Sequence, residues 1–311
     1  MKQQLHIFKA LYASLLFFVL SLTQSCTTHF AFELKEGREF QVSSVPAGSF
    51  RFNSGWDGQL TEPSTGIMIT MTITKGYIMS QTEVTQELWE AVMWDSKNNP
   101  NPSNSVILAY GMEIQEKRPV DNVTWYDAIE FCNKLSEKTG KRKVYTFNGT
   151  IIRDTDGSIT DVVSGVTADF SKNGYRLPTE MEWMWAAMGA NYCDSDTGYQ
   201  KSFAGTSGSA LNENVWHSGN SYTQTHQVGI KKANELGLFD MSGNVWEWCW
   251  DGGGSYPSVD STDYRLDSGT NRVRRGGTFV SSGSQINIAY RIAQPSHVTN
   301  DDYGLRFARN W

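Results

Sequence analysis

The chain has 311 residues, a formal net charge of −6 at pH 7, and aromatic residues at 13% of its length. A chain with this negative net charge provides no basic surface that could bind the phosphates of a nucleic acid, so we expect no nucleic-acid partner. No Pro/Gly/Ser-rich linker and no block of charge divides the sequence after its first 25 residues. We therefore expect one domain over residues 26–311.

The first 25 residues have the pattern of an export signal. Lys2 and Lys9 precede an apolar stretch at 10–22 that is too short and too near the terminus for a membrane span. The sequence LTQSC at 22–26 resembles a loose bacterial lipobox, in which the cysteine is acylated and becomes the first mature residue. Cys26 would then anchor the exported protein to a bacterial membrane, at the cell surface, through more than one acyl chain. The alternative is an ordinary secretory signal with an incidental cysteine.

Three helices are predicted from capping residues and apolar spacing. A short helix begins after Thr85, and a longer one begins after the N-cap Thr124 and stops near Gly140. A third begins after Thr179, where Glu182 has the spacing of a capping box. Short strand-like runs, glycines and polar loops lie between them, which favours an α+β fold with few helices and much irregular chain.

The stretch RRGGTFVSSGSQINIAYRIAQ at 274–294 joins a glycine pair to alternating apolar residues. Ile286, Ile288, Tyr290 and Ile292 alternate as they would in a half-buried strand, with all four side chains on one face. The alternative is that some of these side chains line a ligand pocket. Periodicity alone leaves both interpretations open.

Seven ordered blocks cover nearly the whole chain after the signal: VPAGSF at 45–50, TEVTQELWEAVM at 82–93, PVDNVTWYDAIEFCNKLSEKTG at 119–140, NGYRLPTEMEW at 173–183, GLFDMSGNVWEWCWD at 237–251, RVRRGGTF at 272–279 and YGLRFAR at 303–309. In this order the blocks resemble the formylglycine-generating enzyme, or sulfatase-modifying factor, family. The resemblance implies a variant of the C-type lectin fold, with little regular structure around small twisted sheets.

Catalytic members of this family have two cysteines shortly after the R-G-G block, which bind copper and oxidise a substrate cysteine. The matching positions here are Ser281 and Ile286, and neither side chain can supply a thiolate. No cysteine follows Cys249, and Cys132, Cys193 and Cys249 lack the C-x-x-C spacing of a zinc site. We therefore expect no oxidase activity and no catalytic residues.

Asn244 and Glu247 match positions at which the family's second calcium site takes side-chain oxygens, so calcium is the one cofactor that the resemblance suggests. The alternative is structural: Asn244 caps a turn, and Glu247 pairs with a buried arginine. Acidic partners expected of the family's other calcium site are missing from NENVWHSGNSYTQTHQ at 212–227.

The chain resembles a second group with this fold more closely, the variable proteins of diversity-generating retroelements. Within that group it is most similar to the treponemal proteins. In that group a reverse transcriptase rewrites a C-terminal segment, here 272–311, to change binding specificity. This resemblance implies a surface-displayed, monomeric protein that binds an unidentified protein or other surface ligand and touches the membrane only through its lipid. A fixed-specificity or structural lipoprotein is the alternative, and an enzyme is the third.

Two sets of residues follow from that resemblance. The scaffold set is Arg274, Arg275, Gly276, Gly277, Arg291, Gly304 and Arg306. The candidate ligand contacts are Val280, Ser281, Ser284, Ile286, Ile288, Tyr290, Ile292, His297, Val298 and Asn300. Tyr290 is the most useful contact type among them, because tyrosine provides a large amphipathic surface at low entropic cost. We expect about half of these candidates to be exposed, because alternate strand positions must face the core.

Overall fold

A computed structural model describes residues 28–34, 39–53, 66–94, 102–103, 113–155, 158–162, 165–190 and 201–311. The predicted export signal, its lipidation residue Cys26, and Cys193 lie outside these residues. Within the described part of the chain, no helix has the length and apolar character needed to cross a membrane.

The largest sheet brings the two ends of the described chain together. Its strand order is β1 (His29–Glu33), β2 (Glu39–Val45), β5 (Tyr77–Ser80), β16 (Ala308–Asn310) and β10 (Tyr175–Arg176), and every pairing is antiparallel. The last strand, β16, thus lies between strands from the first and middle thirds of the sequence. The C-terminal segment is therefore held inside the fold rather than appended to it.

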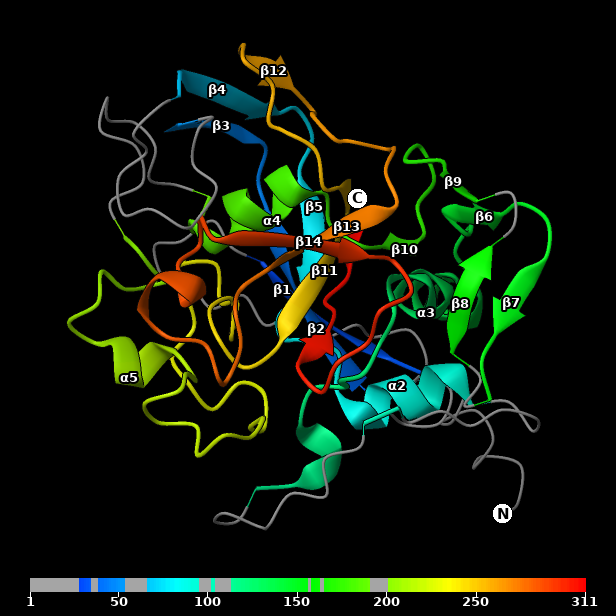
Figure 1. Ribbon diagram of the computed structural model, residues 1–311, viewed down its shortest axis with the longest axis horizontal. Coiled ribbons are helices and arrows are strands. Elements are labelled where there is room, and N and C mark those ends of the chain that lie inside the picture. Colours follow the sequence, from blue (N-terminus) through cyan, green and yellow to red (C-terminus); the bar gives the residue numbers. More distant parts are fainter. Residues whose placement is uncertain are drawn as a thin grey trace, which may run out of the picture.

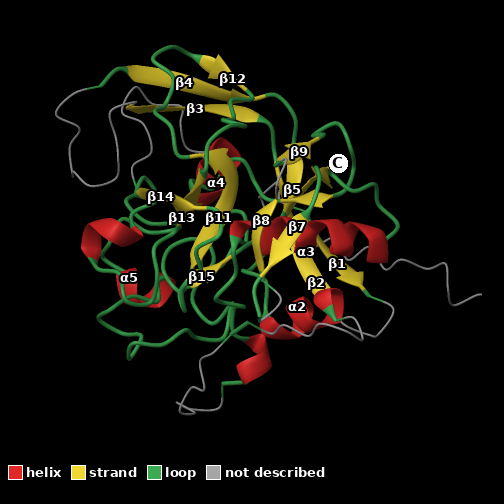
Figure 2. Ribbon diagram, turned by 45° about the vertical axis from the view of Figure 1, so that its right-hand side comes forward, coloured by secondary structure: helices red, strands yellow, loops and turns green. Residues whose placement is uncertain are grey.

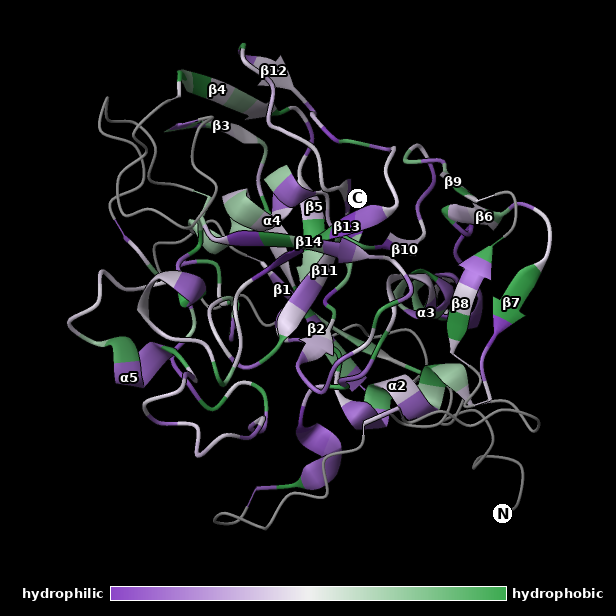
Figure 3. Ribbon diagram, in the orientation of Figure 1, coloured by the Kyte–Doolittle hydropathy of each residue, from purple (hydrophilic) through white to green (hydrophobic). Residues whose placement is uncertain are grey.

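A second sheet carries most of the C-terminal segment. Its order is β14 (Arg291–Pro295), β13 (Asn271–Arg275), β11 (Trp246–Gly252) and β15 (Tyr303–Gly304), with β15 parallel to β11. β11, β13 and β14 cross the centre of the molecule (Figure 1). Three of the five residues of β13 are arginines, so this central strand is coloured as hydrophilic in Figure 3.

The remaining strands form three small sheets. One has three strands, in the order β12 (Ser261–Thr262), β4 (Met68–Ile73) and β3 (Gly48–Asn53). The other two are pairs: β6 (Tyr145–Phe147) with β9 (Val166–Ala168), and β7 (Ile151–Arg153) with β8 (Ile159–Val162). Figure 2 shows long loops joining these short elements. The α+β class with small sheets, few helices and much irregular chain is confirmed.

The three predicted helices are present with the expected N-caps. α2 (Gln86–Met93) follows Thr85, whose side chain accepts a hydrogen bond from the Leu88 N–H. α3 (Trp125–Lys138) and α4 (Glu180–Ala187) each begin with a complete capping box, at Thr124 and Thr179. Gly140, just after α3, has φ +68°, the left-handed conformation that ends many helices. The shorter helices are η1 (Gln115–Lys117), α5 (Leu211–Asn214) and η2 (Gly283–Ile286).

Two clusters of buried side chains lie on either side of β11. The apolar face of α3 packs in one cluster with Trp248 and Trp250, and α4 packs in the other with Cys249. All seven residues of β11 are buried, as is expected of a strand covered on both faces. β11 thus fixes the position of β13 and, through it, of the C-terminal segment.

Candidate ligand-binding site

The C-terminal segment enters the central sheet at β13, leaves it, and returns at β14. Of the two interpretations of 286–292, the half-buried strand through Ile286 does not hold, because β14 begins only at Arg291. Residues before Arg291 form turns held by polar side chains. Ser282 and Gln285 form a capping box around η2, and the Asn287 side chain accepts a hydrogen bond from the Ala289 N–H.

The ten candidate ligand contacts divide by exposure. Six are at least partly exposed: Val280, Ser284, His297 and Asn300 are exposed, and Ile292 and Val298 are half-buried. The other four are buried: Ser281, Ile286, Ile288 and Tyr290. The exposed residues lie on two connections, 280–285 and 297–302, and on the edge strand β14. The expectation of ligand contacts at the four buried positions needs correction, because their side chains face the interior.

Tyr290 is the clearest of these corrections. Its side chain is 6% exposed and stacks on Trp246, with ring centroids 5.8 Å apart. Ile286 is fully buried against the glycine pair, and Ile288 belongs to the cluster that contains α4. The alternation of apolar residues therefore reflects packing on two sides of a turn-rich connection, and it does not mark one exposed face.

Arg275 holds this connection in place from β13. Its guanidinium is fully buried, and one nitrogen, Nη1, lies within hydrogen-bond distance of the carbonyl oxygens of Ile288, Ala289 and Tyr290. Its Nε donates to Glu180 in the first turn of α4, at 2.8 Å. A single arginine thus joins the helix, the sheet and the irregular connection.

Glu180 also binds Arg291, so two arginines share one buried carboxylate. The Arg291 Nε lies 2.8 Å from the Glu180 Oε1, and the Arg291 Nη1 donates to the carbonyl of Gly254. Burial by itself raises the pKa of Glu180, but Arg275 and Arg291 outweigh it, and the net shift is downward. The carboxylate therefore stays ionised inside the protein and fixes the start of β14.

Both positions of the glycine pair after β13 favour glycine. Gly276 and Gly277 have φ of +98° and +75°, a region that other residues rarely adopt. A Cβ at Gly277 would lie 2.5 Å from the carbonyl oxygen of Gln285. A Cβ at Gly304 would lie 2.6 Å from the carbonyl oxygen of Val120. Close backbone approaches thus explain Gly277 and Gly304, and the positive φ explains Gly276.

Arg274 is buried among aromatic rings. Its guanidinium carbon lies 3.3 Å from the centroid of Tyr303 and 5.2 Å from that of Trp248. Its Nε and Nη1 have no hydrogen-bond partner within the described residues, and burial lowers its pKa to about 10. Ring faces surround this cation in a cation–π arrangement, and Asp302 and Tyr303 offset part of the effect of burial on its pKa.

The two candidate calcium ligands are engaged by protein groups. Glu247 and Arg306 form a fully buried ion pair at 2.6 Å, and the same carboxylate oxygen, Oε2, accepts from the Trp183 indole. Asn244, with φ +57°, accepts from the His226 N–H and donates to Glu83. Among the described residues, no group of three or more His, Cys, Asp or Glu side chains is placed to hold a metal ion. Both residues fit the structural alternative better, and calcium binding stays a prediction.

The positions of the family's catalytic cysteines hold no sulfur. The Ser281 hydroxyl accepts a hydrogen bond from the Thr278 N–H at 3.0 Å, and Ile286 is fully buried. Cys132 and Cys249 are free thiols without exposed surface, and burial raises the pKa of each. Both thiols are enclosed, and neither stands at the position of a catalytic cysteine of the family.

Comparison with known proteins agrees with this geometry. Residues 31–311 match the "Sulfatase-modifying factor enzyme 1-like domain" family. The chain belongs to this family. Among solved structures it is similar to Treponema denticola variable protein 1, at 32% identity and a TM-score of 0.74, over 91% of this chain and 99% of that one. The C-type lectin-like architecture of the formylglycine-generating subclass follows from these matches.

Curated relatives carry different names. The chain is 36% identical to "Chaperone protein LppX" of Paenibacillus barcinonensis over 252 residues, which is 75% of this chain and 80% of the relative. It is 33% identical to the formylglycine-generating enzyme of Thermomonospora curvata over 142 residues, 41% of this chain. The match spans 46% of that enzyme, less than half its length.

Sequence reasoning did not identify Glu180 as the centre of the scaffold. An acidic residue in the first turn of a helix already has a local explanation, since it complements the helix dipole. Only the fold shows that Arg275 and Arg291 converge on it. The signal in the sequence was that Arg275 and Arg291 have no carboxylate close to them along the chain, so each needs a partner from elsewhere in the fold.

Proposed function

We propose that this protein is a non-catalytic ligand-binding member of the family, exported and lipid-anchored through Cys26. Its ligand would be a protein or another surface molecule, bound by the monomer, nucleic acid takes no part, and calcium is the one cofactor that stays a prediction. Diversification of residues within 272–311 by a retroelement would change its specificity. The likeness to a treponemal variable protein over almost the whole chain supports this proposal.

One observation carries the binding proposal: exposed side chains stand on connections whose ends are fixed by buried residues. Val280 follows the glycine pair, and His297 and Asn300 follow β14. The adjoining Arg275 and Arg306 are fully buried and hydrogen-bonded. Such a framework lets exposed residues change without altering the fold, as in an antibody paratope.

Sequencing the gene from independent isolates tests this proposal. Substitutions should concentrate at the exposed positions of 280–300, and the four buried candidates should change rarely. A near-identical template copy of the segment should lie beside a reverse-transcriptase gene. Variation spread evenly along the chain, with no template copy, would contradict diversification and leave a fixed-specificity protein.

The absence of oxidase activity has a direct test. The protein would be incubated with copper(I), oxygen and a peptide carrying the sulfatase motif. We expect the peptide cysteine to remain unchanged, because neither Ser281 nor Ile286 can supply a thiolate. Appearance of an aldehyde would refute the non-catalytic proposal.

The anchor is tested by mass spectrometry of the N-terminal peptide. We expect acyl mass on Cys26, and release of Cys26→Ala from membranes, because acyl chains supply the membrane affinity. A mature protein with an unmodified first residue would contradict the lipid anchor.

The second candidate function is that of a fixed-specificity lipoprotein of the same fold. The relative that is named a chaperone, which the chain matches over 80% of its length, favours this candidate. The sequencing experiment separates the two, because a fixed-specificity protein would conserve the exposed residues of 280–300.

A further inference from the structure

A loop outside the C-terminal segment lies directly against the exposed connection 280–285. This loop, residues 217–223, comes shortly after α5, and both segments lie on the side of the molecule that carries α5 (Figure 1). The Ser218 N–H donates to the carbonyl of Ser281 at 3.0 Å, and the Ser221 hydroxyl donates to the carbonyl of Phe279 at 2.7 Å. Because these two contacts flank Val280, the loop adjoins the exposed candidate contacts.

Tyr222 is the largest exposed side chain of the 217–223 loop. It is 62% exposed, although the preceding Ser221 is fully buried. Tyr222 and Thr223 both have a left-handed backbone, with φ of +55° and +58°. Side chains other than glycine rarely adopt this conformation, and where they do, the surrounding contacts hold them in it, frequently at binding sites.

Buried contacts beneath the loop hold Tyr222 in this position. The Ser221 hydroxyl accepts a hydrogen bond from the Thr223 N–H at 3.2 Å, and the Ser221 carbonyl oxygen lies 2.8 Å from the His226 Nε2. The buried His226 ring stacks on that of Trp216, with centroids 3.7 Å apart. The loop therefore presents Tyr222 from a fixed base, which lowers the entropic cost of binding through this side chain.

The two segments carry no charged side chain. Their sequences, HSGNSYT at 217–223 and VSSGSQ at 280–285, contain no Asp, Glu, Lys or Arg. His217 is neutral, because its Nδ1 accepts a hydrogen bond from the Gly219 N–H, and burial and the nearby Lys231 lower its pKa. Serine, glycine, asparagine and tyrosine are the residues enriched in antibody paratopes. An uncharged partner surface fits these segments, because a charged group of the partner would meet no opposite charge in them.

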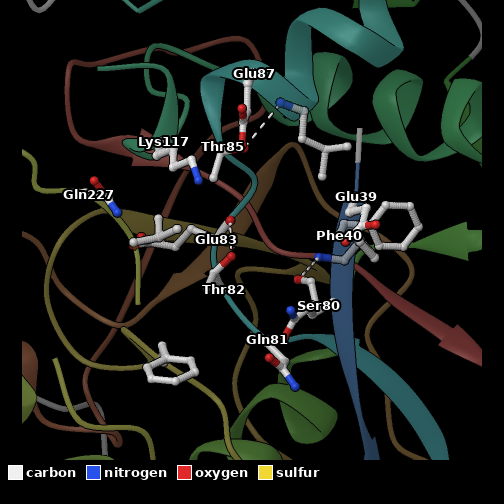
Figure 4. A pocket seen from close by; sticks show the side chains of 15 residues that line it. Glu39, Phe40, Ser80, Gln81, Thr82, Glu83, Thr85, Glu87, Lys117 and Gln227 are labelled. Atoms are coloured by element: carbon white, nitrogen blue, oxygen red, sulfur yellow. Dashed lines mark hydrogen bonds between the residues drawn. The ribbon is translucent and has the colours of Figure 1, made fainter. Parts of the chain in front are cut away.

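Two cavities of small-molecule size lie elsewhere in the described chain. One, of about 550 Å³, has Lys117 and Gln227 on one side and Glu39 and Phe40 on the other (Figure 4). The second, of about 470 Å³, lies around Phe170. No residue of 217–223 or 280–285 lines either cavity. Small molecules bind mostly in such cavities, so the surface at Tyr222 suits a macromolecule better.

We propose that Tyr222 is a fixed contact of the ligand-binding surface, and that its ligand is a folded protein whose contacting face is uncharged. This inference rests on the proposed function, since it adds a fixed loop to the diversified segment. Tyr222 lies outside 272–311, so rewriting of that segment leaves it unchanged. A few aromatic residues carry most of the energy of an interface, so Tyr222 supplies affinity while changes at 280–285 select the partner.

The test diversifies the exposed connection in the laboratory. Codons 280, 282, 284 and 285 are randomised in the full chain after the export signal, displayed on phage, and clones are selected on ubiquitin as a folded-protein probe. Dextran, an uncharged polysaccharide, is the second probe. Each selected clone is then measured with Tyr222→Ala, Tyr222→Phe and Trp94→Ala. Trp94 is the matched control, because it is 61% exposed and lies at the end of α2, outside both segments.

We expect clones that bind ubiquitin and that lose affinity about tenfold with Tyr222→Ala, because the ring is removed. Tyr222→Phe, which keeps the ring, should cost about threefold or less, and Trp94→Ala should leave the affinity unchanged. Clones that tolerate Tyr222→Ala would overturn the fixed contact, while still supporting binding through 280–285. Clones that bind dextran alone would overturn the protein ligand, and a library without binders would overturn this surface. Diversification in nature is judged separately, by sequencing the isolates.

Discussion

Two parts of the C-terminal segment reverse the usual relation between polarity and burial. In β13 and after β15, Arg274, Arg275 and Arg306 are at most 1% exposed. In the connection between β13 and β14, the aliphatic Val280 is 49% exposed. The arginines are buried because carboxylates, carbonyls or ring faces surround them, and Val280 is exposed on a turn between the buried residues Phe279 and Ser281. In this segment, the groups that surround a side chain decide whether it is buried, and its own hydropathy matters less.

The largest effect is expected where one carboxylate serves two arginines. Glu180→Ala would leave Arg275 and Arg291 without their shared carboxylate, and the free energy of unfolding should fall by about 4 kcal/mol. Urea unfolding of both proteins measures it. Glu213→Ala, in an exposed ion pair with Lys232, is the control and should change stability little. A small effect of Glu180→Ala would mean that the arginines find other partners.

Tyr290→Ala should lower the free energy of unfolding by about 3 kcal/mol, because it removes a buried ring that packs on Trp246. The same urea titration applies. Tyr222→Ala, at a tyrosine that is 62% exposed, should have a smaller effect. If Tyr290→Ala proved the milder of the two, the side chain of Tyr290 would belong to the exposed set after all.

A pH effect should come from Asp240, whose pKa burial raises from 3.8 to about 6. The folded protein then holds this proton more tightly than the unfolded chain, so stability falls as pH rises from about 4 through 6. The shift corresponds to about 3 kcal/mol. Asp240→Asn, which mimics the neutral acid, should remove this part of the pH dependence.

Unfolding midpoints at pH 4.5 and pH 7.5 give the difference for each protein. The exposed Asp301→Asn is the control and should keep the wild-type difference. Equal pH dependence in the wild type and in Asp240→Asn would contradict the assignment of this proton to Asp240.

The smallest effect is expected at the exposed positions. Val280→Ser, Ser284→Ala and His297→Ala should each change the free energy of unfolding by about 0.5 kcal/mol or less, because surface side chains contribute little to stability. Denaturant melts of the single variants and of the triple variant measure this. A loss of several kcal/mol in the triple variant would mean that these loops belong to the framework, which would remove the physical basis for diversification.

Sequence patterns predicted the helices well because each helix start is encoded locally. Thr85, Thr124 and Thr179 cap their helices through contacts that span three residues. The half-buried strand that was one interpretation of 286–292 is absent before Arg291, because alternation of apolar residues is also compatible with a turn-rich chain buried on both sides. There the Asn287 and Gln285 side chains compete with strand pairing by bonding to nearby backbone groups.

By itself, the sequence determined the family blocks, the helix starts, and the absence of thiols at Ser281 and Ile286, because these depend on residue identity and short spacing. Tertiary structure alone decided which candidate contacts are exposed, and that Glu180 holds both Arg275 and Arg291. It also brought the 217–223 loop against the connection 280–285. Burial and ion pairing depend on groups far apart in the chain, and no local pattern records which of them meet.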